Sequence, residues 1–290
     1  MKLMRIGDRG RERPYLLLDD GRVLDVGDLT PDFTPDFLAS GPAGLDRLRA
    51  AARSASGAGS AIDLATAGRV GAPIPRPGKI VCIGLNYADH AAETGAAVPT
   101  EPVVFMKASN TLVGPYDEVR IPRGSAKTDY EVELGVVIGT EARYLDSAEA
   151  GLAAVAGYLV CNDVSEREYQ LERGGQWDKG KSCESFNPAG PHLVTADQVA
   201  DPGALDLWLD VNGVRRQDSN SKNLIFGVGE VIRYLSHFMV LEPGDLINTG
   251  TPGGVALATG NPGDYLKPGD VVELGIAGLG SQKQTFVAAP

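Results

Sequence analysis

The sequence predicts a β-rich α+β fold. Short apolar runs separated by Gly and Pro turns recur along most of the chain, whereas helical segments are few and do not alternate regularly with these runs. The missing βαβ alternation favours a curved mixed or antiparallel sheet over a parallel sheet covered by helices. With 290 residues, 43% of them hydrophobic, the chain can form one large domain, alone or with a small companion.

The N-terminal part of the chain, residues 1–71, predicts a small α/β unit. Two β-runs around the turn Asp19-Asp20-Gly21 are typical of a hairpin, and two helical segments follow. The expected ranges are 15–18 and 23–26 for the hairpin and 35–39 and 44–53 for the helices. Residues 72–78 hold three prolines, which exclude regular structure, so this segment is the expected linker to a larger domain at 79–290.

The larger domain is expected to contain most of the strands. Its predicted strands are 80–83, 103–106, 130–138, 159–161, 205–211, 245–248 and 271–276. Its predicted helices are 87–94, 165–173 and 228–236.

Charge and composition exclude several classes of function. The formal charge of −11 argues against nucleic acid, because phosphate binding requires clustered Lys and Arg. The N-terminus lacks the apolar core of a secretory signal, and the longest weakly polar run, 151–161, has about half of the ~20 residues that cross a bilayer. We therefore expect a cytoplasmic protein that binds neither nucleic acid nor membrane. The three cysteines lack C-x-x-C spacing and are expected to be structural thiols.

Asp129, Glu131 and Glu133 alternate with apolar residues on one predicted strand. Strand periodicity places the apolar residues on a core face and the three acids on the opposite face. Glutamates two positions apart repel one another, so a core-forming strand favours them only with a compensating cation. The alternative is a half-exposed strand whose acids are solvated.

Asp163 adds a carboxylate near this strand. It follows a predicted buried strand and precedes a predicted helix in which Ser165 and Glu168 have the spacing of a capping box. Because Ser165 suits the cap, Asp163 is free to bind a ligand, although capping by Asp163 itself is the alternative. Coordination by carboxylates alone favours a hard cation such as Mg²⁺ or Mn²⁺ over zinc.

Several motifs in a fixed order resemble the fumarylacetoacetate hydrolase family. They are G-L-N-Y-x-x-H-x-x-E at 84–93, Y-E-V-E-L-G at 130–135, N-D-V-S at 162–165, K-S at 181–182 and T-G-T-P-x-G-V at 249–255. The resemblance covers residues 79–288, and several motifs in order are more specific than any one of them.

The resemblance implies a mixed β-sandwich roll with a small N-terminal domain, usually assembled as a homodimer. It also implies Mg²⁺, with Mn²⁺ as the alternative, held by Glu131, Glu133 and Asp163. The stretch 165–182 resembles the bacterial branch that includes 2,4-diketo-3-deoxy sugar-acid hydrolases. Acylpyruvate hydrolases and oxaloacetate decarboxylases share the core motifs, so the substrate stays open.

The expected reaction is hydrolysis of the C3–C4 bond of a small 2,4-dioxo acid, either an acylpyruvate or a diketo-deoxy sugar acid, with release of pyruvate or a related 2-oxo acid. The metal stabilises the enolate left by the cleavage. His90 and Glu93 share one helix face, so Glu93 can orient His90 as the base that activates water. Lys181 is expected to stabilise the oxyanion at C4. A solvated surface position is the alternative for each, and the family motifs favour the catalytic roles.

Four further residues are expected to contact the substrate. Arg167 and Gln170 lie about one helical turn apart, and Thr251 lies in a tight loop whose hydroxyl and backbone N–H groups suit a carboxylate. Lys107, at the end of a predicted strand, is expected to help neutralise charge. Surface positions for Arg167 and Gln170 and a plain β-turn at Thr251 are the alternatives.

Rival interpretations remain for the acidic cluster and for one glycine-rich segment. Residues 175–182 satisfy the P-loop pattern G-x-x-x-x-G-K-[ST], but a P-loop requires a strand before it and a helix after it, whereas a predicted helix precedes this segment and a predicted turn follows. A purely structural cation would require neither His90 nor Lys181. Among enzymes, oxaloacetate decarboxylation or a related lyase reaction is the alternative, because it uses the same metal but no water at C4.

Overall fold

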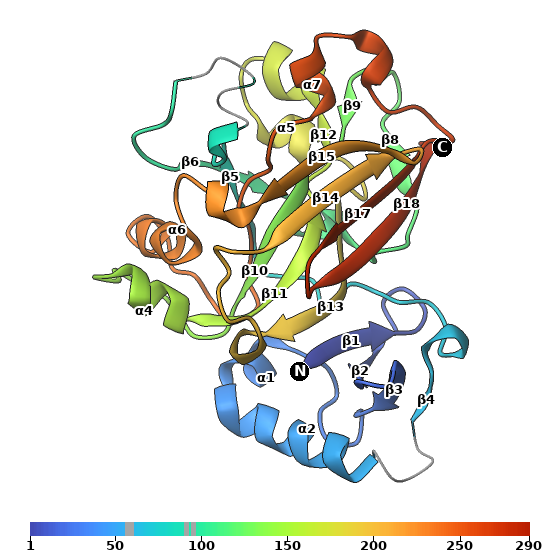
Figure 1. Ribbon diagram of the computed structural model, residues 1–290, viewed down its shortest axis with the longest axis vertical. Coiled ribbons are helices and arrows are strands. Elements are labelled where there is room, and N and C mark those ends of the chain that lie inside the picture. Colours follow the sequence, from blue (N-terminus) through green and yellow to red (C-terminus); the bar gives the residue numbers. More distant parts are fainter. Residues whose placement is uncertain (56–60, 90–92, 94–96) are drawn as a thin grey trace.

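The computed structural model describes residues 1–55, 61–89, 93 and 97–290. These residues form a strand-rich α+β fold with two main β-sheets, and the strands of the N-terminal unit form one edge of the larger sheet (Figure 1). The predicted fold class is therefore confirmed.

The larger sheet has eleven strands in the described part of the chain. In spatial order they are β4 (Ile62–Asp63), β3 (Arg22–Asp25), β2 (Arg13–Leu17), β1 (Lys2–Ile6), β13 (Asn187–Thr195), β11 (Val155–Asn162), β10 (Val132–Ile138), β16 (Leu246–Asn248), β5 (Ile80–Gly84) and β6 (Val103–Lys107), with β7 (Leu112–Val113) beside β13. The pairs β16–β5 and β7–β13 are parallel and the others antiparallel, so the sheet is mixed.

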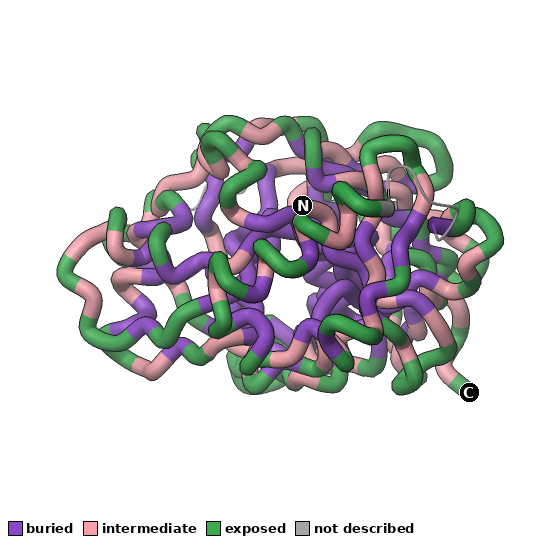
Figure 2. The backbone as a smooth tube through the Cα atoms, turned by 90° about the horizontal axis from the view of Figure 1, so that it is seen from below, coloured by how far each residue is buried: buried purple, intermediate pink, exposed green. Residues whose placement is uncertain are grey.

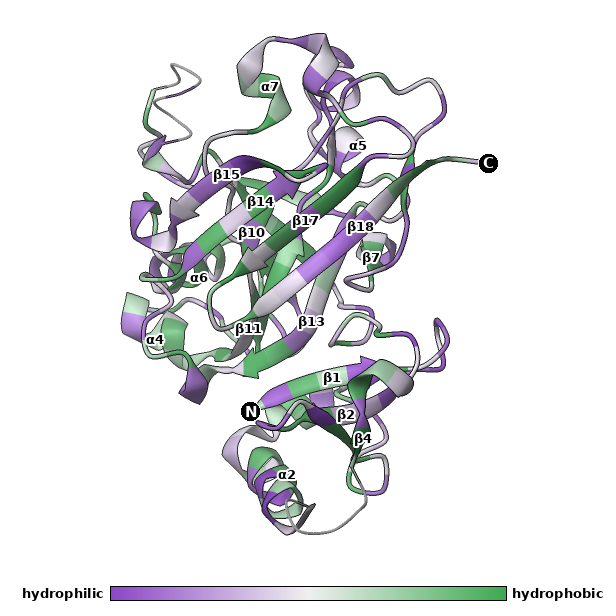
Figure 3. Ribbon diagram, turned by 45° about the vertical axis from the view of Figure 1, so that its right-hand side comes forward, coloured by the Kyte–Doolittle hydropathy of each residue, from purple (hydrophilic) through white to green (hydrophobic). Residues whose placement is uncertain are grey.

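The second sheet has five strands among the described residues. They are, in order, β15 (Val214–Asn220), β14 (Asp206–Val211), β17 (Val271–Ile276), β18 (Gly280–Ala288) and β8 (Val119–Ile121). A separate pair consists of β12 (Ser165–Glu166) and β9 (Thr128–Asp129). In Figure 3, β17 is hydrophobic over most of its length whereas the edge strand β15 is hydrophilic, which suits a strand edge exposed to water.

The described helices lie around the sheets, and all but the 15-residue α2 have at most eight residues (Figure 1). They are α1 (Pro35–Ala39), α2 (Gly41–Ala55), α4 (Ala148–Ala153), α5 (Asp178–Lys181), α6 (Val228–Leu235) and α7 (Ala256–Thr259), with a π-helical turn at Glu168–Glu172. Short 3₁₀ turns lie at Leu64–Thr66, Ser109–Thr111, Ala196–Gln198, Ser221–Asn223 and Pro262–Asp264. Within the described ranges, no helix is both long and apolar enough to cross a membrane.

Strand β10 is buried on both faces. Val132 and Leu134 belong to the core shared with β14, β17 and α6, whereas Val137 belongs to a second core shared with α1 and α2. Figure 2 shows the buried stretches gathered inside the molecule and the exposed stretches in outer turns. Because each buried Val or Leu side chain contributes about 1.5–3 kcal/mol, this double packing fixes which way every side chain of β10 points.

The N-terminal unit is joined to the larger sheet by main-chain pairing. β1 pairs antiparallel with β13, with Lys2 opposite Val194 and Leu3 opposite Leu193. The expected linker at 72–78 carries neither helix nor strand. The division into domains at 1–71 and 79–290 stays a prediction, since β1 continues the sheet of the larger part.

Most predicted elements agree with the structure within a few residues, but the helix predicted at 165–173 is partly wrong. Ser165 and Glu166 form β12, and the helical turn begins after them. The Ser165 hydroxyl donates to the Asp163 carbonyl and caps no helix, because pairing with β9 holds this backbone in an extended conformation. The helix predicted at 87–94 lies partly outside the described residues. Cys82 and Cys161 are buried free thiols, as expected.

Candidate active site

Three buried carboxylates meet where β10 lies beside the end of β11. Glu131 and Glu133 point to the same side because side chains alternate along an extended chain. The register of the two strands pairs Val132 with Asn162, so Asp163 lies across from Glu131, and the Asp163 N–H donates to the Glu131 carbonyl at 2.9 Å. Oxygens of Glu131, Glu133 and Asp163 lie within 4.8 Å of one another. The strand register therefore completes the acidic face that the sequence predicts.

Two buried lysines neutralise part of this negative charge. Lys181 Nζ lies 2.6 Å from Glu131 Oε2 and 2.9 Å from Asp163 Oδ2. Lys107 Nζ forms an ion pair with Asp163 and donates to the Val164 carbonyl at 3.1 Å. Lys181 therefore bridges Glu131 and Asp163, and Lys107 is a second cation paired with Asp163.

Lys181 reaches the site from helix α5, and Gly180 permits this approach. A Cβ at Gly180 would lie 2.3 Å from the Glu166 carbonyl oxygen, so a larger residue would push α5 away. A π-helical turn, and not a strand, precedes residues 175–182, which agrees with the rejection of a P-loop. A short turn at Glu184 and Ser185 follows, and strand β13 begins at Asn187, where the turn was still expected.

Arg167 joins the cluster through all three of its terminal nitrogens. Its Nε lies 2.8 Å from Asp129 Oδ2, and its Nη2 lies 2.7 Å from Glu131 Oε1. Its Nη1 donates to Gln170 Oε1 at 3.0 Å. The structure therefore brings the predicted pair Arg167 and Gln170 into direct contact beside the carboxylates, and both are buried instead of lying on the surface.

Asp129 has a role that the sequence analysis did not assign. Besides holding Arg167, its buried carboxylate accepts the N–H groups of Ala256 at 2.9 Å and Leu257 at 3.0 Å, at the start of α7. Alternation with Glu131 places Asp129 on the acidic face, which was visible in the sequence. Its partners in α7 were not, because they are distant along the chain.

Burial and neighbouring charges shift the pKa values of Glu131 and Glu133 in opposite directions. Burial acts to raise the pKa of Glu131, but attraction to Lys181 and Arg167 outweighs burial and leaves this pKa lowered. Burial, together with repulsion by Asp163 and Glu131, raises the pKa of Glu133 well above its usual range. Glu133 accepts the Gly250 N–H at 2.8 Å but forms no ion pair within the described part of the chain.

The buried charge cluster has one excess negative charge when all its groups are ionised. Its members are the carboxylates of Asp129, Glu131, Glu133 and Asp163 and the cations of Lys107, Arg167 and Lys181. An uncompensated buried charge is costly, and crowded carboxylate oxygens are the ligands that hard divalent cations prefer. Glu131, Glu133 and Asp163 therefore fit a divalent cation of the Mg²⁺ or Mn²⁺ type.

A cavity of about 210 Å³ opens onto this cluster. The predicted site residues that line it are Glu131, Glu133, Arg167, Gln170, Lys181 and Thr251. Lys107, which was predicted to contact the substrate, is buried against Asp163 and is not among the described lining residues.

Thr251 is held in the cavity wall by the interior of the fold. Its hydroxyl donates to the Val132 carbonyl at 2.9 Å and accepts from the Gln217 amide at 2.9 Å. The Gly250 N–H, which was expected to bind a substrate carboxylate, is used by Glu133. A contact between Thr251 and the substrate remains a prediction that rests on its position in the wall.

His90 lies outside the described residues, so its predicted role as a base stays a prediction. Glu93 is described, and its Oε2 accepts the Gly254 N–H at 2.8 Å. Asn86 anchors the same loop, since its side-chain amide donates to the Thr249 carbonyl at 2.7 Å. Asn86 and Glu93 of this motif therefore lie against the loop that carries Thr251.

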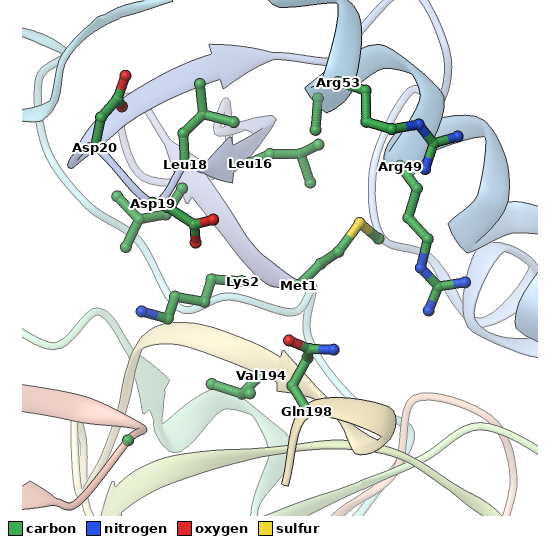
Figure 4. Close-up of a pocket in the computed structure, with 13 residues that line it drawn as sticks. Met1, Lys2, Leu16, Leu18, Asp19, Asp20, Arg49, Arg53, Val194 and Gln198 are labelled. Atoms are coloured by element: carbon green, nitrogen blue, oxygen red, sulfur yellow. The ribbon is translucent and has the colours of Figure 1, made fainter. Parts of the chain in front are cut away.

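A larger cavity of about 770 Å³ lies between the N-terminal unit and β13. Figure 4 shows Arg49 and Arg53 of α2 on one side of it, with Lys2 and Asp19 nearby. Arg49 is already paired with acidic neighbours. None of the predicted site residues is among the described residues that line this cavity, so the smaller cavity is the candidate active site.

A strand-rich fold with three crowded carboxylates beside a small cavity defines a protein class suited to binding a divalent cation and a small molecule. The chain belongs to the fumarylacetoacetate hydrolase family, because residues 79–287 match the family described as fumarylacetoacetate (FAA) hydrolase C-terminal. The resemblance found in the sequence motifs is therefore confirmed.

Relatives of this chain include hydrolases and an isomerase. A "Putative hydrolase" of Burkholderia multivorans is 52% identical over 295 residues, which cover 100% of both chains. Maleylpyruvate hydrolase from Sphingobium sp. SYK-6, whose crystal structure contains manganese(II) ion and pyruvate, has a TM-score of 0.81 and 28% identity over 100% of both chains. The 5-carboxymethyl-2-hydroxymuconate delta-isomerase from Mycobacterium smegmatis has a TM-score of 0.77 and 30% identity, again over 100% of both chains.

The first prediction concerns Glu133→Gln in the metal-free protein. Because the folded state holds the Glu133 proton more tightly than the unfolded chain, this group stabilises the fold below the usual carboxyl range, and that stability is lost as pH rises through the raised pKa. At neutral pH in a chelator, Glu133→Gln should therefore raise the melting temperature, by about 2–4 °C for each kcal/mol of relieved repulsion.

The same variant should lose the rise in melting temperature that Mg²⁺ or Mn²⁺ gives the wild type. Glu141→Gln, at an exposed glutamate, is the control and should change neither value. A wild type that is more stable than Glu133→Gln in chelator at neutral pH would contradict the electrostatic interpretation.

Proposed function

We propose that this protein is a metal-dependent hydrolase that cleaves the C3–C4 bond of a small 2,4-dioxo acid and releases pyruvate or a related 2-oxo acid. The observation that carries the proposal is the buried triad Glu131, Glu133 and Asp163, whose carboxylate oxygens crowd together beside a cavity. Mg²⁺ is the proposed ion, with Mn²⁺ as the alternative. The manganese ion and pyruvate in the maleylpyruvate hydrolase structure support this proposal by similarity.

Glu131, Glu133 and Asp163 would hold the cation, which when bound supplies Lewis-acid stabilisation of negative charge on the substrate oxygens. Lys181 lines the cavity beside them. Burial acts to lower its pKa, but the charges of Asp163 and Glu131 outweigh burial and raise it, so Lys181 stays protonated. Its ammonium is therefore available to stabilise negative charge that develops at C4.

The polar side chains beside the carboxylates are pre-arranged to orient a substrate. Arg167 is fixed by three hydrogen-bonding partners, and Gln170 is fixed in turn by Arg167. A buried side chain with a single allowed position contributes binding without a large entropy cost. We assign Arg167, Gln170 and Thr251 to contacts with substrate oxygens.

His90 is the proposed base. It takes a proton from water, and the resulting hydroxide adds to C4. The C3–C4 bond then breaks, its electron pair passes to C3 as the enolate of the 2-oxo acid, and a proton added at C3 completes the product. Glu93 is proposed to orient His90, and the hydrogen bond from Gly254 supports this by holding Glu93 next to the loop of the cavity wall.

Oxaloacetate decarboxylation on the same scaffold is the alternative, because it would use the same carboxylates and Lys181 but no water at C4. Assembly as a homodimer and residence in the cytoplasm also remain predictions.

Removal of metal should abolish the reaction. Purified protein with Mg²⁺ should release pyruvate from an acylpyruvate or a related 2-oxo acid from a diketo-deoxy sugar acid, as followed by a coupled dehydrogenase assay. Exhaustive chelation should stop the release, and Mg²⁺ or Mn²⁺ should restore it. Glu131→Gln should lower turnover by more than ~100-fold while the protein stays folded. Full activity after chelation would contradict the proposal, and isomerisation without release of a 2-oxo acid would reassign the reaction.

Lys181→Met separates charge stabilisation from metal binding. Turnover should fall about 10²- to 10³-fold, as for loss of one oxyanion donor. The Kd for Mn²⁺ should stay the same or tighten, because Lys181 competes with the cation for Glu131 and Asp163. Lys179→Met, on the same helix but exposed, is the control and should retain both values. Equal losses of turnover and metal affinity would place Lys181 in the metal site instead.

His90→Ala and Glu93→Gln separate hydrolysis from decarboxylation. Hydrolysis of a 2,4-dioxo acid should fall by ~10²- to 10⁴-fold in His90→Ala, the span of general-base effects, and less in Glu93→Gln. The wild-type rate should fall as pH drops through the histidine range near ~6.5, because the protonated imidazole cannot accept a proton. Decarboxylation of oxaloacetate, measured in parallel, should change little. Wild-type hydrolysis rates in both variants would rule out this pair, and His237→Ala serves as the control.

A further inference from the structure

The candidate cavity is lined by two kinds of side chain. The charged and polar ones include Glu131, Glu133, Arg167, Gln170 and Lys181, and the apolar ones are Ile83, Leu85, Phe105, Leu171, Trp177 and Leu257. A 2,4-dioxo acid placed with its carboxylate at the acidic cluster would bring its C4 substituent against the apolar side chains.

The cations that line the cavity are already committed to protein carboxylates. Arg167 pairs with Asp129 and Glu131, and Lys181 pairs with Glu131 and Asp163. A carboxylate at the far end of the substrate would therefore meet apolar side chains among the described lining residues, and burying an unpaired carboxylate is strongly unfavourable.

One residue of the apolar lining, Leu85, has an unfavourable backbone conformation, which indicates a function. Leu85 has a φ of 54°, in the left-handed region that non-glycine residues rarely adopt. The next residue, Asn86, is held in place because its side-chain amide donates hydrogen bonds to the Thr249 and Phe226 carbonyls. Trp177 packs on Phe105 with ring centroids 5.3 Å apart and lies so close to Gly84 that a Cβ there would approach its ring to 2.5 Å.

We propose that this cavity selects 2,4-dioxo monocarboxylates whose C4 substituent is a small uncharged alkyl group, with Leu85, Leu171, Trp177 and Leu257 as specificity-determining residues. This inference rests on the proposed function and narrows its substrate class. The cavity is small, with a volume of about 210 Å³, which favours a short alkyl group.

Two substrates of matched length test the proposal on the full-length protein with Mg²⁺. Butanoylpyruvate and succinylpyruvate differ only in a terminal carboxylate, and a diketo-deoxy sugar acid adds a hydroxylated chain. We expect kcat/KM for butanoylpyruvate to exceed both others by at least about tenfold, the ratio that 1.4 kcal/mol produces. Equal or higher kcat/KM for either polar substrate overturns the inference but leaves the proposed function standing. No 2-oxo acid released from any of the three overturns the proposed function itself.

Leu171→Lys should shift this preference, because it places an uncommitted cation at the cavity. The ratio of kcat/KM for succinylpyruvate to that for butanoylpyruvate should rise at least about tenfold. Leu152→Lys is the matched control, since Leu152 is 41% exposed and Leu171 is 43% exposed, and Leu152 does not line the cavity. An unchanged ratio in folded Leu171→Lys, or an equal rise in Leu152→Lys, overturns the assignment.

Leu85→Gly tests the apolar wall without straining the backbone, because glycine adopts positive φ readily. The melting temperature should hold or rise, whereas KM for butanoylpyruvate should rise several-fold with a smaller change in kcat. Tyr144→Gly is the control, since Tyr144 also has a positive φ, of 49°, but is 67% exposed and away from the cavity. Wild-type KM in Leu85→Gly removes Leu85 from the specificity-determining set.

Discussion

Repulsion among Glu131, Glu133 and Asp163 is the constraint to which the surrounding site responds. Strand pairing makes these carboxylates neighbours, and burial removes the water that would screen them. Three cations pair with them, each from a different part of the chain: Lys107 lies on β6, Arg167 lies after β12, and Lys181 lies on α5. Because buried ion pairs seldom add net stability, and because the fully ionised cluster has one unbalanced negative charge, this arrangement is best explained by the binding of a cation.

Strand β10 can keep the glutamates in this unfavourable position because it packs between two hydrophobic cores. One face packs on the smaller sheet and the other packs toward α1 and α2. Gly135 tightens the contact further, since a Cβ there would lie 2.5 Å from the Leu159 side chain. A rotation that released the glutamates to water would expose both cores. The apolar packing thus supplies the stability that the charge cluster lacks.

The cavity combines parts of the chain that do not touch in sequence. Its charged and polar lining comes from the start of β10, from the segment after β12 and from α5, and its apolar lining comes from β5, from β6, from Trp177 and from α7. Asp129 ties two of these parts together, because its one carboxylate holds both Arg167 and the start of α7. Buried hydrogen bonds therefore fix α7 beside the charge cluster.

The sequence by itself determined what depends on local geometry. Alternation along a strand assigned Glu131 and Glu133 to one face, prolines excluded regular structure at 72–78, and the spaced motifs identified the family. Only the tertiary structure decided that Asp163 lies opposite Glu131, that Lys107 faces Asp163 instead of the cavity, and that Ser165 pairs in a strand instead of capping a helix. These outcomes depend on strand register and on contacts between distant residues, which local patterns do not encode.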